Sequence, residues 1–269
     1  MTFATPSRTL ETRPAGGRTR DHGDDRWRVP VLDARPTGPA RRFAARLSSR
    51  RPATVFLVAI VSGLALVAAL SIALGLLVTD VLVHAWGIGA ADERVDVWLA
   101  AHRTATRDDA SLIGSIMAGG VVLPVVAAAL ALVFAALRHW RLAVFTIFAL
   151  GVESASYALT TLVVHRHRPR VVRLEHLPVN ASYPSGHTAA SIAVYSGLVL
   201  LLTSRFKSAF FNAVAWTVAV AIPAFVATSR MYRGMHHPLD VAGGVVIGIA
   251  ALLVVVFACR AADAATAER

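Results

Sequence analysis

The chain has 269 residues, of which 56% are hydrophobic and only 16% are charged, and its formal net charge is +11. Soluble domains average about 25% charged residues, so this composition excludes an ordinary water-soluble fold. The positive charge does not indicate nucleic-acid binding, because much of it is arginine next to a long apolar run, an arrangement typical of membrane proteins.

The first 52 residues carry 12 arginines against five acidic residues, contain no lysine and are rich in proline and glycine. This composition predicts that residues 1–52 are a basic, disordered cytoplasmic tail. Phe43 and Leu47 lie four residues apart in the stretch ARRFAARLSSRR, so a short helix at the membrane surface is the alternative.

Six apolar runs follow the tail, and each is near or above the roughly 17–25 residues that a helix needs to cross about 30 Å of hydrocarbon. We therefore predict an all-α protein, a bundle of six transmembrane helices over residues 53–260, with a short cytoplasmic tail at 261–269. The single cysteine, Cys259, excludes a disulfide framework and a cysteine-based metal site. The six runs are Ala53–Thr79, Ala110–Leu137, Leu142–Val164, Thr188–Ser204, Ser208–Ser229 and Val241–Cys259.

The connections between these runs predict the orientation in the membrane. With the N-terminus in the cytoplasm, six spans return the C-terminus to the same side, and the short connections Arg138–Arg141 and Ser204–Ser208 are basic, as cytoplasmic loops are. The extracytoplasmic segments are then 80–109, 165–187 and 230–240. The last two are rich in arginine, although basic residues are usually concentrated in the cytoplasmic loops of membrane proteins. This exception indicates that an anion binds on the extracytoplasmic face.

Glu153 is the one ionisable residue deep within a predicted span. Such residues usually face the bundle interior. Glu153 is therefore a candidate to relay protons or to bind a substrate, and a hydrogen bond to a neighbouring helix is the structural alternative. Pro223 predicts a helix kink, and the pairs Gly119–Gly120 and Gly243–Gly244 predict close packing.

Three polar clusters lie at the extracytoplasmic ends of spans three to six: HRHRPR at 165–170, SYPSGHTAAS at 182–191 and SRMYRGMHHPLD at 229–240. In a compact bundle these ends share one membrane face, so we expect them to form one pocket. Arg168 and Arg230 offer planar sets of donors suited to phosphate oxygens. Ser185 and Gly186 begin a helix, where free N–H groups favour an anion.

Histidines in the same clusters can carry out phosphoryl chemistry. One imidazole attacks phosphorus while another protonates the departing oxygen. An attacking imidazole needs its other nitrogen held by a carboxylate, and Asp240 follows His236 by four residues. The structural alternatives are that Asp240 only caps the last helix and that the arginines extend to lipid headgroups.

The motifs resemble those of the type 2 phosphatidic acid phosphatase superfamily, whose core is shared with vanadium haloperoxidases. The family pattern is Lys-x6-Arg-Pro, then Pro-Ser-Gly-His, then Ser-Arg-x5-His-x3-Asp. The second part is present as PSGH at 184–187, and the third as Ser229-Arg230, His236 and Asp240. In the first part Arg168-Pro169 matches, but Thr161 stands where the family has lysine.

The resemblance implies a role for each matching residue. His236 is the nucleophile that forms a phosphohistidine, Asp240 orients it, and His187 protonates the leaving group and then activates water. The implied site needs no metal and no other cofactor. The phosphate-binding residues carried over are Arg168, Ser185, Gly186 and Arg230, with Thr161 as a hydroxyl replacement for the family lysine.

These residues predict a membrane phosphatase acting on a lipid phosphate, such as phosphatidic acid, phosphatidylglycerol phosphate or an isoprenoid diphosphate such as undecaprenyl diphosphate. The alternatives are a lipid-phosphate-binding pseudoenzyme, because of Thr161, and an anion transporter. The expected partners are the lipid substrate and membrane lipids, with no nucleic acid. The alanine- and arginine-rich composition favours a bacterial cell membrane. His237 lacks a carboxylate at the family spacing, so we expect it at the pocket rim or in a helix cap.

Overall fold

The computed structural model describes residues 29–176 and 181–267, and the regular elements within them are helices, which confirms the all-α class. In chain order they are a 3-10 turn (Pro30–Leu32), α1 (Pro39–Arg46), α2 (Pro52–Leu76) with a π-helical continuation (Leu77–Ala85), α3 (Gly89–Ala101), α4 (Ala105–Met117), α5 (Val122–Ala136), α6 (Trp140–Thr161), α7 (Gly186–Ser191) joined through a π-turn (Ile192–Ser196) to α8 (Gly197–Thr203), α9 (Ala209–Tyr232) and α10 (Pro238–Ala267).

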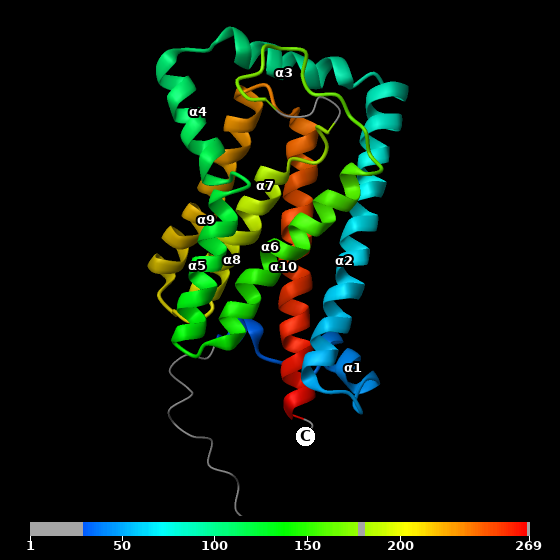
Figure 1. Ribbon diagram of the computed structural model, residues 1–269, viewed down its shortest axis with the longest axis vertical. Coiled ribbons are helices and arrows are strands. Elements are labelled where there is room, and N and C mark those ends of the chain that lie inside the picture. The colour runs from blue at the N-terminus through cyan, green and yellow to red at the C-terminus, as the bar shows by residue number, and fades with distance from the viewer. Residues whose placement is uncertain (1–28, 177–180, 268–269) are drawn as a thin grey trace, which may run out of the picture.

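Helix α10 forms the centre of the bundle and packs against α1, α2, α6 and α7 (Figure 1). Its side chains Ile247, Ala251 and Val255 are completely buried. By contrast, large apolar side chains such as Leu66 and Phe210 are 72% and 81% exposed on the outside of the bundle. Helices that are apolar on both their inner and outer faces are suited to hydrocarbon rather than to water. The fold is therefore that of a multi-pass membrane protein.

Helix α3 lies across the end of the bundle opposite to α1 and to the end of α10 (Figure 1). Asp92 of α3 ties it to the rest of the bundle, because one carboxylate oxygen accepts a hydrogen bond of 2.5 Å from Arg166 and the other accepts one of 3.1 Å from the Leu239 amide. This end of the bundle holds all three polar clusters.

The second predicted span is not a single helix. The run Ala110–Leu137 is divided between α4 and α5, whose axes differ by 45°. Gly119 and Gly120 lie in the break. A Cβ on Gly120 would meet no atom within 4 Å, and the nearest atom to one on Gly119 is the Ile116 carbonyl oxygen of the preceding turn, at 3.2 Å, so the pair interrupts the helix and provides no close packing between helices. Five helices of the described chain are long and apolar enough to cross a membrane, or six if the bent pair counts as one span.

The expectation of a disordered tail is wrong for residues 39–46, because they form α1. Ala40 and Ala44 of α1 are buried against α10, and the Phe43 ring packs edge-on against Phe257 at a centroid distance of 5.5 Å. The alternative of a short helix is the one observed, and it is stabilised by this apolar contact. Residues 1–28 lie outside the described residues.

The predicted C-terminal tail also needs correction, because α10 continues to Ala267. Ala261, Ala264 and Ala265 are buried against α1, and Asp263 accepts a hydrogen bond of 2.7 Å from the Ala34 amide. Helix α9 is continuous and contains Pro223 in its interior, and the kink predicted there stays a prediction.

The Gly243–Gly244 pair does provide close packing, as predicted. A Cβ on Gly243 would lie 2.5 Å from the Tyr183 ring, and one on Gly244 would lie 2.5 Å from the carbonyl oxygen of Ser185. Only glycine allows α10 to approach so near the start of α7. This contact sets the distance between the second and third polar clusters.

Candidate active site

One cavity of about 250 Å³ brings together residues from all three polar clusters. Arg168, Gly186, His187 and His236 line it, and they come from the α6–α7 connection, the start of α7 and the α9–α10 connection. The remaining lining residues come from the α4–α5 break, α5, α6 and α7: Ala118, Gly119, Gly120, Leu123, Pro124, Leu150, Glu153, Ser154, Tyr157 and Ala190.

His236 is buried, and its Nδ1 lies 2.6 Å from the carbonyl oxygen of Ser182. A carbonyl oxygen only accepts hydrogen bonds, so Nδ1 carries the proton and Nε2 keeps its lone pair. Burial lowers the pKa of His236 well below its usual value; Asp240 opposes this, while Arg230 and Arg168 lower it further. The imidazole is therefore neutral at physiological pH, the form in which it acts as a nucleophile.

Asp240 supports His236 mainly through Ser182 rather than by direct contact. The carboxylate Oδ2 is 4.0 Å from Nδ1 of His236 but accepts a hydrogen bond of 2.5 Å from the Ser182 hydroxyl. The Ser182 carbonyl, in turn, holds the His236 ring. This role of Ser182 was not predicted from the sequence, although the residue is the first of the second polar cluster.

His237 differs from its neighbour in both position and charge. It does not line the cavity; its ring lies 3.3 Å from Asp240 and 3.1 Å from Glu93. Burial acts to lower the pKa of His237, but the hydrogen bond and charge of Asp240, with help from Glu93, raise it above the usual value. Its amide donates a 2.8 Å hydrogen bond to Asp240, so of the two expected positions, the rim and the helix cap, the structure places His237 at the cap.

Arg230 is completely buried and only part of its guanidinium is used by the protein. Nη1 donates to the Ser115 hydroxyl and, at 2.7 Å, to Glu175, whereas Nε and Nη2 have no hydrogen-bond partner among the described residues. Buried donors without a partner are costly, so they mark a place where an anion is expected. Arg168 lines the cavity and also donates hydrogen bonds to the carbonyl groups of Met235 and Ala181. These bonds hold the α6–α7 connection against the α9–α10 connection.

Glu175 is a second residue that the sequence argument missed. Its carboxylate accepts hydrogen bonds from Arg230, from Arg233 at 2.6 Å and from Ser115 at 2.7 Å. Burial acts to raise the pKa of Glu175, but the charge of Arg230 and these hydrogen bonds lower it to about 2. No motif marks Glu175, because the residues it contacts are more than 50 positions away in the chain.

The start of α7 is held rigidly next to the histidines. The Ser185 amide donates a 2.9 Å hydrogen bond to the Asp240 carbonyl, and its hydroxyl lies 2.9 Å from that of Thr188. A Cβ on Gly186 would lie 3.1 Å from the ring of Tyr157. Glycine at this position therefore lets Tyr157 pack against the start of α7, whose first amides have no partner within the helix itself.

Thr161 does not lie where the resemblance would need it. It does not line the cavity, and its hydroxyl donates a 2.9 Å hydrogen bond back to the Ala158 carbonyl in its own helix. Arg166, a cation of the first polar cluster, joins Asp92 to Asp240. This placement differs from the expectation that Thr161 contacts phosphate, because the last turn of α6 points its side chain away from the cavity.

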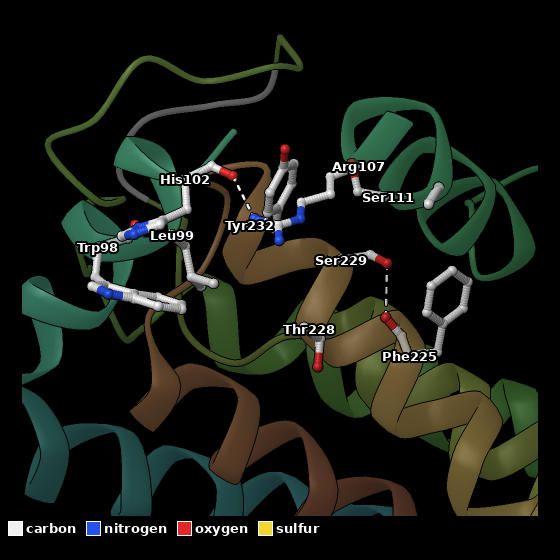
Figure 2. Close-up of a pocket in the computed structure, with 10 residues that line it drawn as sticks. Trp98, Leu99, His102, Arg107, Ser111, Phe225, Thr228, Ser229 and Tyr232 are labelled. Carbon is white, nitrogen blue, oxygen red and sulfur yellow. Dashed lines mark hydrogen bonds between the residues drawn. The ribbon is translucent and has the colours of Figure 1, made fainter. Parts of the chain in front are cut away.

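A second cavity, of about 290 Å³, lies between α3, α4 and α9, and Figure 2 shows the side chains around it. Ser229 belongs to the third motif but lines this second cavity, where its hydroxyl donates a 2.7 Å hydrogen bond to the Phe225 carbonyl (Figure 2). Successive helical residues point in different directions, so Arg230 is directed away from this cavity, toward Ser115 and Glu175. The Ser229 side chain thus packs α9 against α4, where Gly114 leaves space for it.

The described residues form a helical membrane bundle in which His187, His236 and Arg168 line one cavity, a site suited to phosphoryl transfer. Arg230 and Ser185 are buried and do not themselves line this cavity. Residues 138–262 match the family model of the PAP2 superfamily. The chain has a TM-score of 0.59 with the crystal structure of a transmembrane PAP2 type phosphatidylglycerolphosphate phosphatase from Bacillus subtilis, at 20% identity over 76% of this chain and 94% of that one. The expected resemblance to the type 2 phosphatidic acid phosphatase superfamily is confirmed.

Two curated relatives are also phosphatases. The human sphingosine-1-phosphate phosphatase 2 is 39% identical over 88 residues, which are 32% of this chain and 21% of that protein. The undecaprenyl-diphosphatase of Sulfolobus acidocaldarius is 30% identical over 123 residues, which are 45% of this chain and 55% of that protein. The chain thus spans between a fifth and about half of the length of these relatives.

Proposed function

We propose that this protein is an integral-membrane lipid phosphatase that acts through a phosphohistidine at His236, within a phosphatase domain of residues 53–260. The observation that carries the proposal is the cavity lined jointly by His187, His236, Arg168 and Gly186. The named activities of the matched relatives, all of them on lipid phosphates, support the substrate class.

In the first step, the Nε2 lone pair of His236 attacks phosphorus and the bond from phosphorus to the lipid oxygen breaks. His187 gives its proton to that oxygen, so the lipid leaves as an alcohol. The phosphate oxygens are bound by Arg168, Arg230, Ser185 and the start of α7 at Gly186. The donors that we assign to them on Arg230 are Nε and Nη2, which have no hydrogen-bond partner among the described residues.

In the second step, His187 takes a proton from water, and the resulting hydroxide attacks phosphorus. The bond from phosphorus to Nε2 breaks and inorganic phosphate leaves, which restores both histidines. The Ser182 carbonyl keeps the proton on Nδ1 of His236, and Asp240 stabilises the positive charge that the ring acquires.

The α6–α7 and α9–α10 connections, which carry Arg168 and His236, lie at the end of the bundle opposite to α1 and the end of α10 (Figure 1). We place this end on the extracytoplasmic side, because α1, the α5–α6 connection and the α8–α9 connection lie at the opposite end (Figure 1). These segments and their flanks are rich in basic residues: the arginines of 35–51, Arg138, Arg141 and Lys207. A cavity between helices at the membrane surface gives access to a headgroup while the lipid tails stay in hydrocarbon.

The proposal predicts that the purified protein releases phosphate from at least one lipid phosphate in the presence of EDTA. His236→Ala should abolish release, because no nucleophile remains, while Asp109→Asn, an exposed change on the same face, should not. Phosphate release is measured for phosphatidic acid, phosphatidylglycerol phosphate and undecaprenyl diphosphate. Binding of these lipids without release would support the pseudoenzyme instead, and release abolished by EDTA would contradict a mechanism without metal.

A further inference from the structure

Glu153 is a cavity-lining group that the proposed mechanism does not use. Its side chain is 2% exposed, it lines the same cavity as both histidines, and it belongs to α6, well inside the apolar part of the bundle. Oε2 accepts a 3.0 Å hydrogen bond from the adjacent Ser154, but Oε1 has no partner among the described residues. A hydrogen bond to a neighbouring helix, the structural role, is therefore not the one observed.

The position of Glu153 relative to the phosphate follows from helix geometry. Tyr157 packs its ring against Gly186, at the level assigned to the phosphate. Glu153 is one turn of α6 away from Tyr157 in the direction of the membrane interior, which is about 6 Å along the helix axis. A group attached to the first carbons beyond a bound phosphoester therefore reaches the level of Glu153.

The lining of the cavity changes from polar to apolar in the same direction. Arg168, His187 and His236 lie near the phosphate level, and Leu150, Leu123 and Ala190 lie deeper, toward the middle of the bundle. A lipid phosphate that enters with its headgroup at the histidines thus extends its chain past Glu153. A buried acceptor that lacks a partner destabilises the empty site, and a donor on the lipid supplies that partner.

Resting on the proposed function, we infer that Glu153 is a specificity-determining residue, which accepts a hydrogen bond from a hydroxyl or ammonium group close to the phosphoester of the substrate. The preferred substrates are then lipid phosphates that carry such a donor, rather than polyprenyl phosphates, whose first carbons carry none. Glu153 acts on the choice of substrate and takes no part in bond breaking.

The test compares two substrates that differ in a single group: 1-acyl lysophosphatidic acid, with its free 2-hydroxyl, and the 2-deoxy analogue. The wild-type protein should hydrolyse the hydroxyl form with a kcat/KM about tenfold or more above that of the analogue. Glu153→Leu should remove this preference by lowering kcat/KM for the hydroxyl form only. Ser156→Ala is the matched control, because Ser156 is also a buried residue of α6 whose hydroxyl has no hydrogen-bond partner in the described part of the chain, but it does not line the cavity.

Two results would overturn the inference: equal hydrolysis of both substrates by the wild-type protein, or an equal loss for both in Glu153→Leu. The wild-type comparison stands even if the variant fails to fold. Failure of the proposed function is distinct, because the wild-type protein would then release phosphate from no lipid phosphate at all, whereas release from undecaprenyl diphosphate but from neither test substrate would overturn the inference alone.

Discussion

Two neighbouring histidines in one sequence motif have opposite chemical states because their partners differ. His236 contacts a carbonyl oxygen and lies near two arginines, which, with burial, keeps it neutral. His237 lies between Asp240 and Glu93, and these carboxylates favour its protonated form. The neutral imidazole is the one that lines the cavity, so local electrostatics and position select the same residue.

Glu175 accepts a hydrogen bond from Nη1 of Arg230, and Arg230 is one of the residues proposed to bind phosphate. Glu175→Gln should lower KM for a lipid phosphate by about fivefold, the equivalent of about 1 kcal/mol, because phosphate would no longer compete with a carboxylate for the guanidinium. Steady-state kinetics measures this change, with Asp109→Asn as the control for net charge. A higher KM would instead show that Glu175 positions Arg230 for binding.

The same pairing gives a dependence of stability on pH. The pKa of Glu175 in the folded protein, about 2, lies below its ordinary value of 4.5. A depressed pKa means that the ion pairs stabilise the fold above about pH 4.5, and that this contribution is lost as the pH falls toward 2. Glu175→Gln should therefore show less loss of thermal stability on acidification than the wild-type protein.

At the scale of helices, the site depends on how closely α10 approaches the start of α7. The Ser185 amide bonds to the Asp240 carbonyl, and Gly244 lies against the Ser185 carbonyl. These contacts fix PSGH relative to His236 and Asp240. The break between α4 and α5 contributes as well, because Gly119 and Gly120 line the cavity at the point where the helix is interrupted.

Gly244→Ala should reduce both thermal stability and phosphate release, because the new Cβ would lie 2.5 Å from a backbone atom that has little freedom to move. Overpacking of this kind typically costs about 1–3 kcal/mol. Gly151→Ala in α6 is the control, since its Cβ would meet nothing within 4 Å and alanine favours a helix. Thermal unfolding in detergent measures the difference, and equal melting temperatures for the two variants would contradict the close packing.

At the scale of the molecule, the two ends of the bundle have different chemistry. One end holds α3 together with the α6–α7 and α9–α10 connections, and the other holds α1 packed against the end of α10 (Figure 1). Arg141 links this second end together, with hydrogen bonds to Asp33 and to the Leu32 carbonyl. The basic segment before α2 thus packs against the bundle from Val29 onward.

The proposed orientation predicts which surfaces a reagent outside the cell can reach. In a Cys259→Ala background, Val172→Cys should react with a membrane-impermeant maleimide in intact cells, because Val172 is 78% exposed at the end that holds the cavity. Lys207→Cys, exposed in the α8–α9 connection, should react only after the cells are lysed. The reverse pattern would place the cavity in the cytoplasm.

The sequence by itself determined the helical membrane class, most of the helix positions and the three clusters that meet at one cavity. Apolar run length and fixed motif spacing are local properties, so a linear reading detects them. The tertiary structure decided the 45° break in the second span, the packing of α1, the roles of Ser182 and Glu175, the location of Glu153 and the exclusion of Thr161 from the cavity. Each of these depends on contacts between distant segments or on the direction of a side chain around a helix, and neither is encoded in spacing along the chain.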